Sequence, residues 1–403
     1  MQKEATKHYD IAICGGGVAG CAAALAAARR GCRTLLLEKT VFPGGLATSG
    51  IVLVYLPLCD GRGKQISFGI AEEFLRASNQ YGPEDIPEDW QRAEPDGKSR
   101  LMAYFSPASF VLALDELLQE AGVDLWYDSC LIDCHCQNRR ISAVEVFNKS
   151  GKHTISADIF IDASGDADLA FMAGNPCHCA SNAMVSWIIE HREAENSSAF
   201  TFGKQVSTRI MASPINNEDT EKGINGKMVS EFLLEGRRRY RHELIADYAE
   251  GRETRRSRYP LVLPSMVPLR HTRCIEGDFM LESEMSERDF PDSIGLVPEW
   301  RCVGPSWAIP YGSLLPSGLD NVLAAGRCIS ARDDAWEITR VIPAAALTGE
   351  VAGTAAALAL QKKLMPRALP YEELARELRK KASFILHFAE LQKGQLPVNN
   401  AAG

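Results

Sequence analysis

Three glycines near the amino terminus have a spacing that can serve chemistry. Gly15, Gly17 and Gly20 fit the pattern G-x-G-x-x-G, and Glu38 follows 18 residues after Gly20. Such glycines permit a tight turn, a close approach of backbone to a pyrophosphate, and close packing of a helix. The helix N-terminus binds phosphate, and an acidic residue accepts hydrogen bonds from ribose hydroxyls. The pattern predicts a dinucleotide site; the alternative is a glycine-rich turn in an unrelated α/β protein.

A second glycine cluster follows Glu38, at residues 43–50 with the sequence PGGLATSG. NAD does not require such a cluster. Such a cluster suits FAD, because the extended flavin half must pass close to backbone. The cluster therefore favours FAD, with an ordinary glycine loop as the alternative.

Four residues are candidates for catalysis. Arg270 and Arg273 could clamp a carboxylate, and a histidine such as His271 is the natural proton carrier near neutral pH. Arg340 stands three residues before Pro343, which opens an alanine-rich segment typical of a helix. We therefore expect Arg340 to lie near the flavin. For the cluster at 270–273, the alternative is a structural ion-pair strand.

The elements that must position these residues begin with a strand at 9–14, a helix at 21–30 and a strand at 33–38. This βαβ unit implies a parallel sheet. Periodicity and turn signals predict further elements. The helices are expected at 68–79, 106–121, 226–250, 343–360 and about 370–390, and the strands at 123–128, 131–136, 141–148, 153–162 and 321–325. Residues 80–100 and 213–226 are expected to be surface loops.

The predicted fold class is α/β. It has a Rossmann-like FAD-binding domain, with a parallel sheet flanked by helices and a small antiparallel sheet, and an inserted α+β substrate domain. The FAD-binding domain is expected to be discontinuous, over 7–50, 105–170 and 310–365. The substrate domain takes 51–104 and 171–309, and a C-terminal helix and tail take 366–403.

The motifs together resemble those of FAD-dependent oxidoreductases of the glutathione-reductase-like superfamily. The resemblance rests on the two glycine clusters with Glu38, on the block IDASGDAD at 161–168, and on NVLAAGR at 321–327. The segments 270–273 and 309–314 are similar to those of a broadly distributed bacterial subfamily. The resemblance covers nearly the whole chain.

The resemblance implies FAD, taken as non-covalently bound, with the three glycines at the pyrophosphate and Glu38 at the ribose. It places Gly45 and Thr48 along the flavin half and a main-chain group near Leu131 at the adenine. The helix that begins near Pro343 would direct its N-terminus at the pyrimidine edge of the flavin; the alternative is a packing helix. The predicted cofactor-binding residues are Gly15, Gly17, Val18, Ala19, Gly20, Glu38, Lys39, Gly44, Gly45, Leu46, Ala47, Thr48, Leu131, Ala163, Ser164, Gly165, Gly326, Arg327, Ala344 and Ala345.

Arg327 departs from the pattern of many relatives, which carry an aspartate at this position. An aspartate there binds ribityl hydroxyls or water on the phosphate side, whereas an arginine could neutralise phosphate. We still expect FAD to bind, and the role of Arg327 in this contact stays open.

Composition and missing motifs exclude several classes of protein. The chain has 403 residues, 46% of them hydrophobic, and a net charge of −8. This excludes a disordered protein and makes nucleic acid and anionic membranes poor partners. The first ten residues do not resemble a secretory signal, so we expect a cytoplasmic protein with reduced cysteines. A second dinucleotide motif and a redox cysteine pair after the second glycine cluster are both absent, which argues against two-dinucleotide and disulfide reductases.

Cys177, His178 and Cys179 lack the spacing of zinc ligands, and no metal site is predicted. Cys177 or His178 could instead line the substrate pocket. Eight arginines between residues 236 and 258 suggest a solvated helix face, an anion funnel or an RNA-binding face, and nearby acidic residues favour the solvated face.

The sequence thus predicts an FAD-dependent oxidoreductase that transfers a hydride between a small organic substrate and N5 of the flavin. The alternatives are an FAD-dependent monooxygenase, a tRNA-modifying flavoprotein and a non-catalytic FAD-binding protein. The substrate, the direction of reaction, the electron partner and the oligomeric state stay open, with a homo-oligomer as one alternative.

Overall fold

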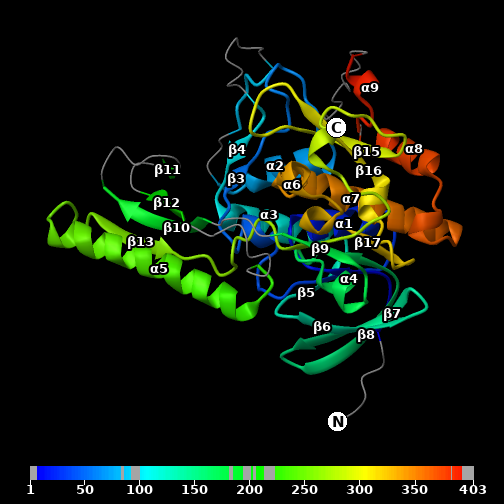
Figure 1. Ribbon diagram of the computed structural model, residues 1–403, viewed down its shortest axis with the longest axis horizontal. Coiled ribbons are helices and arrows are strands. Elements are labelled where there is room, and N and C mark those ends of the chain that lie inside the picture. Colours follow the sequence, from blue (N-terminus) through cyan, green and yellow to red (C-terminus); the bar gives the residue numbers. More distant parts are fainter. Residues whose placement is uncertain are drawn as a thin grey trace.

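The βαβ unit predicted at the amino terminus opens the fold (Figure 1). The computed structural model describes residues 7–82, 86–91, 100–180, 185–193, 201–202, 206–212, 223–382 and 384–392. Strand β1 (Lys7–Cys14) leads through the glycine turn into helix α1 (Val18–Ala28), and β2 (Thr34–Leu37) returns parallel to β1. Helix α1 begins three residues before the predicted start at Cys21, because Gly17 of the turn is itself the N-cap.

A seven-stranded sheet forms around β1. Its order is β5 (Asp124–Trp126), β2, β1, β8 (Gly151–Asp162), β7 (Arg140–Asn148) and β6 (Cys130–Gln137), and β17 (Val322–Ala324) also pairs with β8. Strand β8 pairs antiparallel with β7 through residues 151–156 and parallel with β17 through residues 160–162. The neighbours β5, β2, β1, β8 and β17 are parallel. Their carboxyl ends therefore meet at one edge of the sheet.

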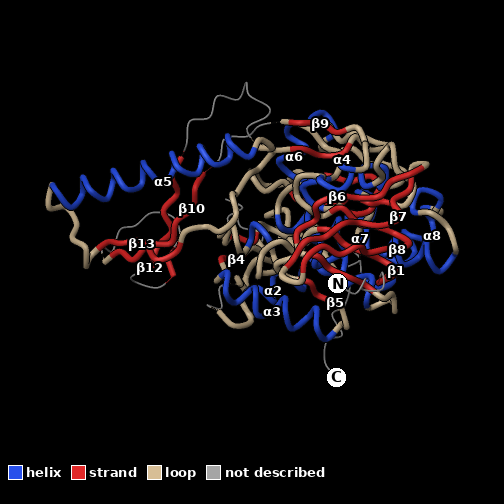
Figure 2. Tube along the Cα trace, turned by 90° about the horizontal axis from the view of Figure 1, so that it is seen from below, coloured by secondary structure: helices blue, strands red, loops and turns tan. Residues whose placement is uncertain are grey.

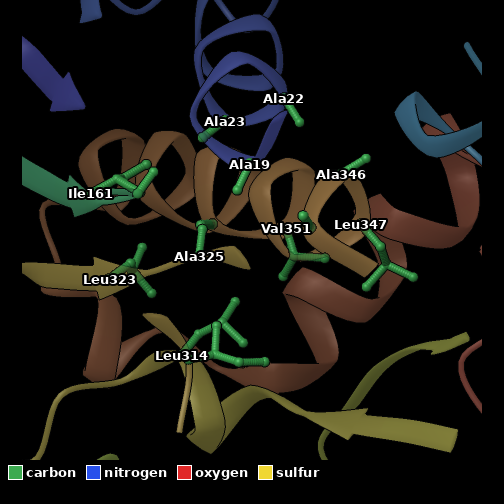
Figure 3. Close-up of a cluster of buried hydrophobic side chains, with 14 of the residues drawn as sticks. Ala19, Ala22, Ala23, Ile161, Leu314, Leu323, Ala325, Ala346, Leu347 and Val351 are labelled. Atoms are coloured by element: carbon green, nitrogen blue, oxygen red, sulfur yellow. The ribbon is translucent and has the colours of Figure 1, made fainter. Parts of the chain in front are cut away.

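Helix α7 (Ile342–Lys362) crosses α1 at very short distance. A Cβ added to Gly349 would lie 2.1 Å from the carbonyl oxygen of Ala19, and one added to Gly353 would lie 2.2 Å from that of Ala23. Figure 3 shows the two helices crossing with Ala19 between them, beside Leu323 and Ala325 at the end of β17. Small residues on both helices thus bring the N-terminus of α1 close to the last strand.

Helix α7 also has the length and hydropathy of a membrane span. However, 89% of its most apolar window is buried inside the structure, as in the core helix of a globular protein.

An arm made of an antiparallel sheet and a long helix projects from the rest of the molecule (Figure 2). The sheet order is β11 (Thr201–Phe202), β12 (Val206–Ala212), β10 (Val185–Arg192) and β13 (Arg258–Val262), and the helix is α5 (Gly226–Ala249). The predicted helix at 226–250 is confirmed. It begins at Asn225, whose side chain accepts hydrogen bonds from the N–H groups of Lys227 and Met228.

Further strands and α-helices complete the described part of the chain. They are β3 (Val54–Tyr55), α2 (Ile70–Ser78), β4 (Ala103–Tyr104), α3 (Pro107–Glu120), α4 (Asp168–Met172), β9 (Cys177–Cys179), β14 (Arg273–Ile275), β15 (Ser293–Pro298), β16 (Ser306–Pro310), α6 (Asp333–Thr339), α8 (Tyr371–Ala382) and α9 (Phe388–Gln392). The predicted helices at 68–79 and 106–121 are confirmed as α2 and α3. The predicted surface loops at 80–100 and 213–226 lie largely outside the described residues.

The prediction of one helix from about 370 to 390 is wrong. Two helices, α8 and α9, take its place. Phe384 and Leu386 between them are buried, and the N–H of Leu386 donates to Glu390 at the start of α9. Burial of these two side chains turns the chain out of the helical path.

Candidate functional site

The carboxyl ends of the parallel strands surround one cavity. Its empty space is about 1130 Å³, including the part open to solvent. Ligands bind open parallel sheets at this edge. Strands β1, β2, β8 and β17 contribute Cys14, Leu37, Ala163 and Ala325, at or directly after their last residues. The other lining residues are Gly15, Gly17, Val18, Ala19, Glu38, Lys39, Gly44, Gly45, Leu46, Ala47, Ser129, Cys130, Leu131, Ser164, Gly165, Asp168, Met266, Gly326, Arg327, Arg340, Ile342 and Ala345.

The first glycine turn leaves backbone open to the cavity. A Cβ on Gly17 would meet no atom within 4 Å, whereas a Cβ on Gly20 would lie 1.8 Å from the carbonyl oxygen of Gly15. Gly17 thus permits close approach of a ligand, and Gly20 permits the packing of α1. The N-terminus of α1 has no side-chain cap, and Val18 and Ala19 line the cavity. Its first N–H groups are therefore available to a phosphate.

The second glycine cluster lies directly beside the first. The N–H of Gly44 donates to the carbonyl oxygen of Gly16 at 2.8 Å, and a Cβ on Gly45 would lie 3.0 Å from Cα of Gly17. Gly44 has a φ of +96°, which favours glycine. The Thr48 hydroxyl donates to the carbonyl oxygen of Pro43 and so closes the loop. Two clusters that are separate in the sequence thus form one continuous wall.

Glu38 stands at the other side of the glycine turn. Its Oε2 accepts a hydrogen bond from the N–H of Gly16 at 2.8 Å, and its Oε1 accepts one from the N–H of Thr40 at 2.7 Å. The carboxylate is therefore held in one orientation, with a further lone pair on each oxygen for a ribose hydroxyl. Leu131 lines the same cavity, together with Ser129 and Cys130.

The end of β17 meets the start of α7 at the opposite part of the lining. The N–H of Gly326 donates to the Thr348 hydroxyl at 2.9 Å. Ile342 and Ala345, in the first turn of α7, line the cavity. The N-terminus of α7 has no side-chain cap, so its N–H groups and its positive dipole end are available to a ligand.

These groups fit the FAD that the sequence predicts. Two uncapped helix N-termini border one cavity, glycine backbone is open to it, and an oriented carboxylate stands beside the glycine turn. A bulky side chain at Gly17 would enter this space.

Arg327 is engaged with protein groups. Its Nε donates to the carbonyl oxygen of Gly165 at 2.6 Å, its Nη1 donates to that of Leu269, and its Nη2 pairs with Asp166 at 2.7 Å. The arginine thus links the IDASGDAD block to the segment that precedes Arg270. It still lines the cavity.

Arg273 is likewise engaged. Its Nη2 pairs with Asp168 at 2.6 Å, its Nε donates to the carbonyl oxygen of Asp166 at 2.8 Å, and its guanidinium lies over the ring of Phe171. Burial raises the pKa of Asp168 to about 6, with Asp166 and Asp162 acting in the same direction. Asp168 lines the cavity, whereas Arg273 lies behind it.

A buried group of four side chains stands beside the start of α7. The Nε of Arg340 donates to Oε2 of Glu337 at 3.0 Å, and Nε2 of His271 lies 3.2 Å from Oε1 of the same carboxylate. The His271 ring stacks on Trp336 with 4.6 Å between centroids. Burial lowers the pKa of His271 to about 4, although Glu337 acts to raise it. His271 is therefore neutral at pH 7.

Most of the predicted cofactor residues come together in this cavity. Of that set, Gly20, Thr48 and Ala344 are not part of the lining. Among the candidate catalytic residues, Arg340 lines the cavity, whereas Arg270, His271 and Arg273 do not. Arg273, which the sequence paired with Arg270, instead binds Asp168 and the main chain of Asp166.

Sequence reasoning missed eight lining residues. They are Cys14, Leu37, Ser129, Cys130, Asp168, Met266, Ala325 and Ile342. The strand-end rule could have found Cys14, Leu37 and Ala325, and Asp168 belongs to the IDASGDAD block. Met266 lies in a loop segment that carries no motif, so no sequence signal pointed to it.

The described part of the chain contains no group of three or more His, Cys, Asp or Glu side chains placed to hold a metal ion. Cys177, His178 and Cys179 form strand β9, which pairs with β14. They do not belong to the lining of the cavity.

Comparison with known proteins agrees with this site. A family model described as FAD dependent oxidoreductase matches residues 10–187 and 296–378, which is more than half of the chain. Among solved structures, a geranylgeranyl bacteriochlorophyll reductase-like protein from Thermoplasma acidophilum is 14% identical over 94% of this chain and 84% of that chain, with a TM-score of 0.50. This similarity is one of fold.

Two further solved structures are similar at lower TM-scores. The p-nitrophenol 4-monooxygenase of Pseudomonas putida is 12% identical, over 93% of this chain and 84% of that chain, with a TM-score of 0.47. A myxobacterial chondrochloren halogenase is 14% identical, over 93% of this chain and 78% of that chain, with a TM-score of 0.44.

Proposed function

Because the chain belongs to the FAD-dependent oxidoreductase family and uses FAD, we propose that it transfers a hydride between a small organic substrate and N5 of the flavin. The observation that carries this proposal is the difference between two parts of the cavity lining. Glu38 stands beside the first glycine turn, whereas Arg340 stands beside the N-terminus of α7. Glu38 is suited to bind the adenosine of FAD. The N-terminus of α7 and Arg340 are suited to bind the flavin half, which reacts.

Each part of the cofactor has a matching group in the chain. Glu38 would hold the adenosine ribose, and the main chain near Leu131 would hold the adenine. The N-terminus of α1 would hold the pyrophosphate. The wall formed by Gly44 and Gly45 leaves room for the flavin half.

The flavin supplies the hydride chemistry when it is bound. The chain supplies binding, orientation and charge. The positive end of α7 would stabilise negative charge at the pyrimidine edge of the flavin. Arg340 is held in place by Glu337 and lines the cavity, so it would orient the substrate. His271 is neutral at pH 7 and can accept a proton, but it lies behind the lining.

The first test is an anaerobic absorption spectrum of the purified protein, reconstituted with FAD if necessary. We expect a flavin band, which a Gly17→Val variant should lack because the new side chain fills the pyrophosphate space. Absence of the band in the unaltered protein would overturn the proposal. Incorporation of an atom of labelled O2 into a substrate would favour a monooxygenase over hydride transfer.

The electron partner follows from the same sample. If NADH or NADPH bleaches the band quickly, a nicotinamide is the electron donor. If neither does, the organic substrate donates the electrons, and the enzyme acts as a dehydrogenase or oxidase.

We further propose that the chain belongs to the glutathione-reductase-like superfamily and to the bacterial subfamily that its sequence resembles. We also propose that the protein is cytoplasmic. It also includes the division into an FAD-binding domain and a substrate domain. The lining residues support this division. Apart from Met266, they fall within 7–50, 105–170 and 310–365, the segments assigned to the FAD-binding domain.

A further inference from the structure

Helix α5 of the arm leaves much of its surface uncovered. Only four of its 24 residues are buried, among them Tyr240 and Leu244, which pack against Ile188 of β10. Leu234 and Ile245 point away from this contact and are 60% and 62% exposed, the highest values among the large hydrophobic side chains of the described residues. Since helices in proteins gain most of their stability by packing an apolar face, this side of α5 is a candidate contact surface.

Charged residues continue the exposed side of α5. Ile245, Arg241 and Arg237 stand four residues apart, so they form one ridge along the helix, which we call the α5 ridge. Neither of these arginines forms a side-chain hydrogen bond or an ion pair with a described residue, whereas their neighbour Arg238 pairs with Glu235. The α5 ridge thus presents an apolar side chain followed by two positive charges.

Helix α3, in the body of the molecule outside the arm, carries the complementary pattern. Leu112, Glu116 and Glu120 also stand four residues apart and form the α3 ridge, and Leu112 is 55% exposed. Glu116 accepts hydrogen bonds from the neutral side chains of Gln80 and Tyr81, and neither glutamate pairs with a cation among the described residues. The whole helix has three acidic residues and no basic one.

The two ridges match when the helices run in opposite directions. Each ridge advances about 6 Å along its helix per step of four residues, so three steps can face each other in register. Ridges of this spacing interdigitate in the commonest class of helix packing. The facing pairs are Ile245 with Leu112, Arg241 with Glu116, and Arg237 with Glu120.

The ridges do not meet within one chain, because Leu112 and Ile245 are both exposed. A second copy can supply the missing ridge to each. Helix α3 lies toward the side of the body from which the arm projects (Figures 1 and 2). Two copies related by a two-fold axis, with their arms antiparallel, can therefore make both contacts at once.

We propose that two copies of this chain form a symmetric dimer in which the α5 ridge of each copy packs against the α3 ridge of the other. One chain carries both complementary surfaces. Its net charge of −8 disfavours nucleic acid and anionic membranes as the partner of the arm. The inference is independent of the proposed function, since neither ridge lines the cavity.

Sedimentation velocity of the purified full chain tests the dimer. At about 50 μM protein we expect a species of twice the mass of one chain, and we expect it to dissociate further as salt is added, because salt screens the ion pairs. A chain that remains monomeric at this concentration overturns the proposal. The same holds for a monomer whose α5 ridge binds phosphatidylserine vesicles and loses that binding in Arg241→Glu.

A charge exchange tests the register. Arg241→Glu and Glu116→Arg should each raise the dissociation constant of the dimer about tenfold or more, because like charges then face each other. The double variant with both changes restores opposite charges at each contact and should recover most of the affinity. Ile245→Asp should weaken the dimer without rescue by Glu116→Arg, because it places a charge against Leu112.

The matched control is Lys149→Glu, which makes the same change of charge elsewhere. Lys149 is 91% exposed in the turn between β7 and β8, outside both ridges, so its dimer should be unaffected. Melting temperature and circular dichroism show whether each variant is folded. A dimer that tolerates Arg241→Glu and Ile245→Asp overturns the α5 ridge as its contact. A failure of Glu116→Arg to rescue Arg241→Glu overturns the pairing with α3.

Discussion

The side chain of Glu38 stabilises the fold and is also placed to bind a ligand. Its two oxygens accept hydrogen bonds from Gly16 and Thr40, so the carboxylate ties the glycine turn to the end of β2. In the proposed site the same oxygens face the ribose. Orientation by backbone N–H groups removes the cost of ordering the side chain when the ligand binds.

Replacement of Glu38 by alanine should raise the dissociation constant of FAD about tenfold or more, because hydrogen bonds to a charged group are lost. Quenching of flavin fluorescence during titration of the apoprotein measures it. The control is Glu145→Ala. Glu145 is a buried acid on β7 that bonds to Thr154 and pairs with His135, away from the cavity. Similar FAD affinities in both variants would contradict the role of Glu38.

Glu350 is a second buried carboxylate, on α7 behind the cavity. Its Oε2 accepts a hydrogen bond from the N–H of Ile70, at the start of α2, at 2.6 Å. Burial raises its pKa to about 7, although this hydrogen bond and Arg30 act to lower it. The protonated form is thus favoured in the folded state.

The stability that Glu350 contributes should be complete below its ordinary pKa of 4.5 and should be lost as the pH rises through about 7. The variant Glu350→Gln stays neutral and keeps an acceptor for Ile70. Relative to this variant, the unaltered protein should lose about 1–3 kcal/mol of unfolding free energy between pH 5 and pH 8. Urea denaturation at both pH values measures the difference. A difference that does not depend on pH would contradict the prediction.

At the scale of elements, the crossing of α1 and α7 links the stability of the folded protein to the geometry of the cofactor site. Gly349 and Gly353 face the carbonyl oxygens of Ala19 and Ala23. Ala19 lines the cavity, whereas Ala23 lies one turn further along α1. The two glycines of α7 should therefore affect the molecule differently.

Gly353→Ala should lower the unfolding free energy by about 1–3 kcal/mol, because the added methyl group has no space between the helix backbones. Gly349→Ala should cost a similar amount and should also weaken FAD binding, since it displaces the first turn of α1. Gly226→Ala in the first turn of α5 is the control, because a Cβ there meets no atom within 4 Å. Chemical denaturation and FAD titration measure the two effects. Unchanged FAD affinity in Gly349→Ala would refute the coupling.

At the scale of the whole molecule, the arm and the cavity are separate structures. The described residues of the arm do not line the cavity. The arm has its own small core around Ile188, Tyr240 and Leu244. Arg258 lies in this arm with its side chain 1% exposed, and it pairs with three carboxylates, Glu190, Glu243 and Asp247.

Arg258→Met should loosen the arm and leave FAD binding unchanged. Loss of the shared partner of buried carboxylates should cost about 3 kcal/mol or more of local stability. Hydrogen exchange of the α5 amides should then become faster, while the FAD dissociation constant stays the same. Arg256→Met, at an exposed position in the turn before β13, is the control. A change in the FAD affinity of Arg258→Met would instead show that the arm and the cavity are coupled.

Three of the eight arginines between residues 236 and 258 pair with acidic residues close in the sequence. Arg238 and Arg239 pair with Glu235, and Arg252 pairs with Asp247. These pairs agree with the solvated helix face that the sequence favours. Arg258 differs, because its partner Glu190 lies on β10, 68 residues away. Sequence spacing alone therefore could not distinguish it from its neighbours.

The sequence by itself determined the strands of the seven-stranded sheet, most of the helices and the two glycine clusters. Apolar runs, helical periodicity and glycine spacing depend on residues that are close along the chain, so local patterns predict them. The positions of Glu38, Gly17 and the start of α7 follow from these patterns. They account for most of the cavity lining.

Only the tertiary structure decided which side chains face each other. Arg273 pairs with Asp168, Glu337 lies against both Arg340 and His271, and Gly44 lies beside Gly16. Apart from Arg340 and Glu337, these partners lie far apart in the chain. Their pairing depends on how strands and helices pack, on which groups are buried, and on which charges then need partners. Local patterns carry no information on such contacts, so the place of Met266 in the cavity lining emerged only from the fold.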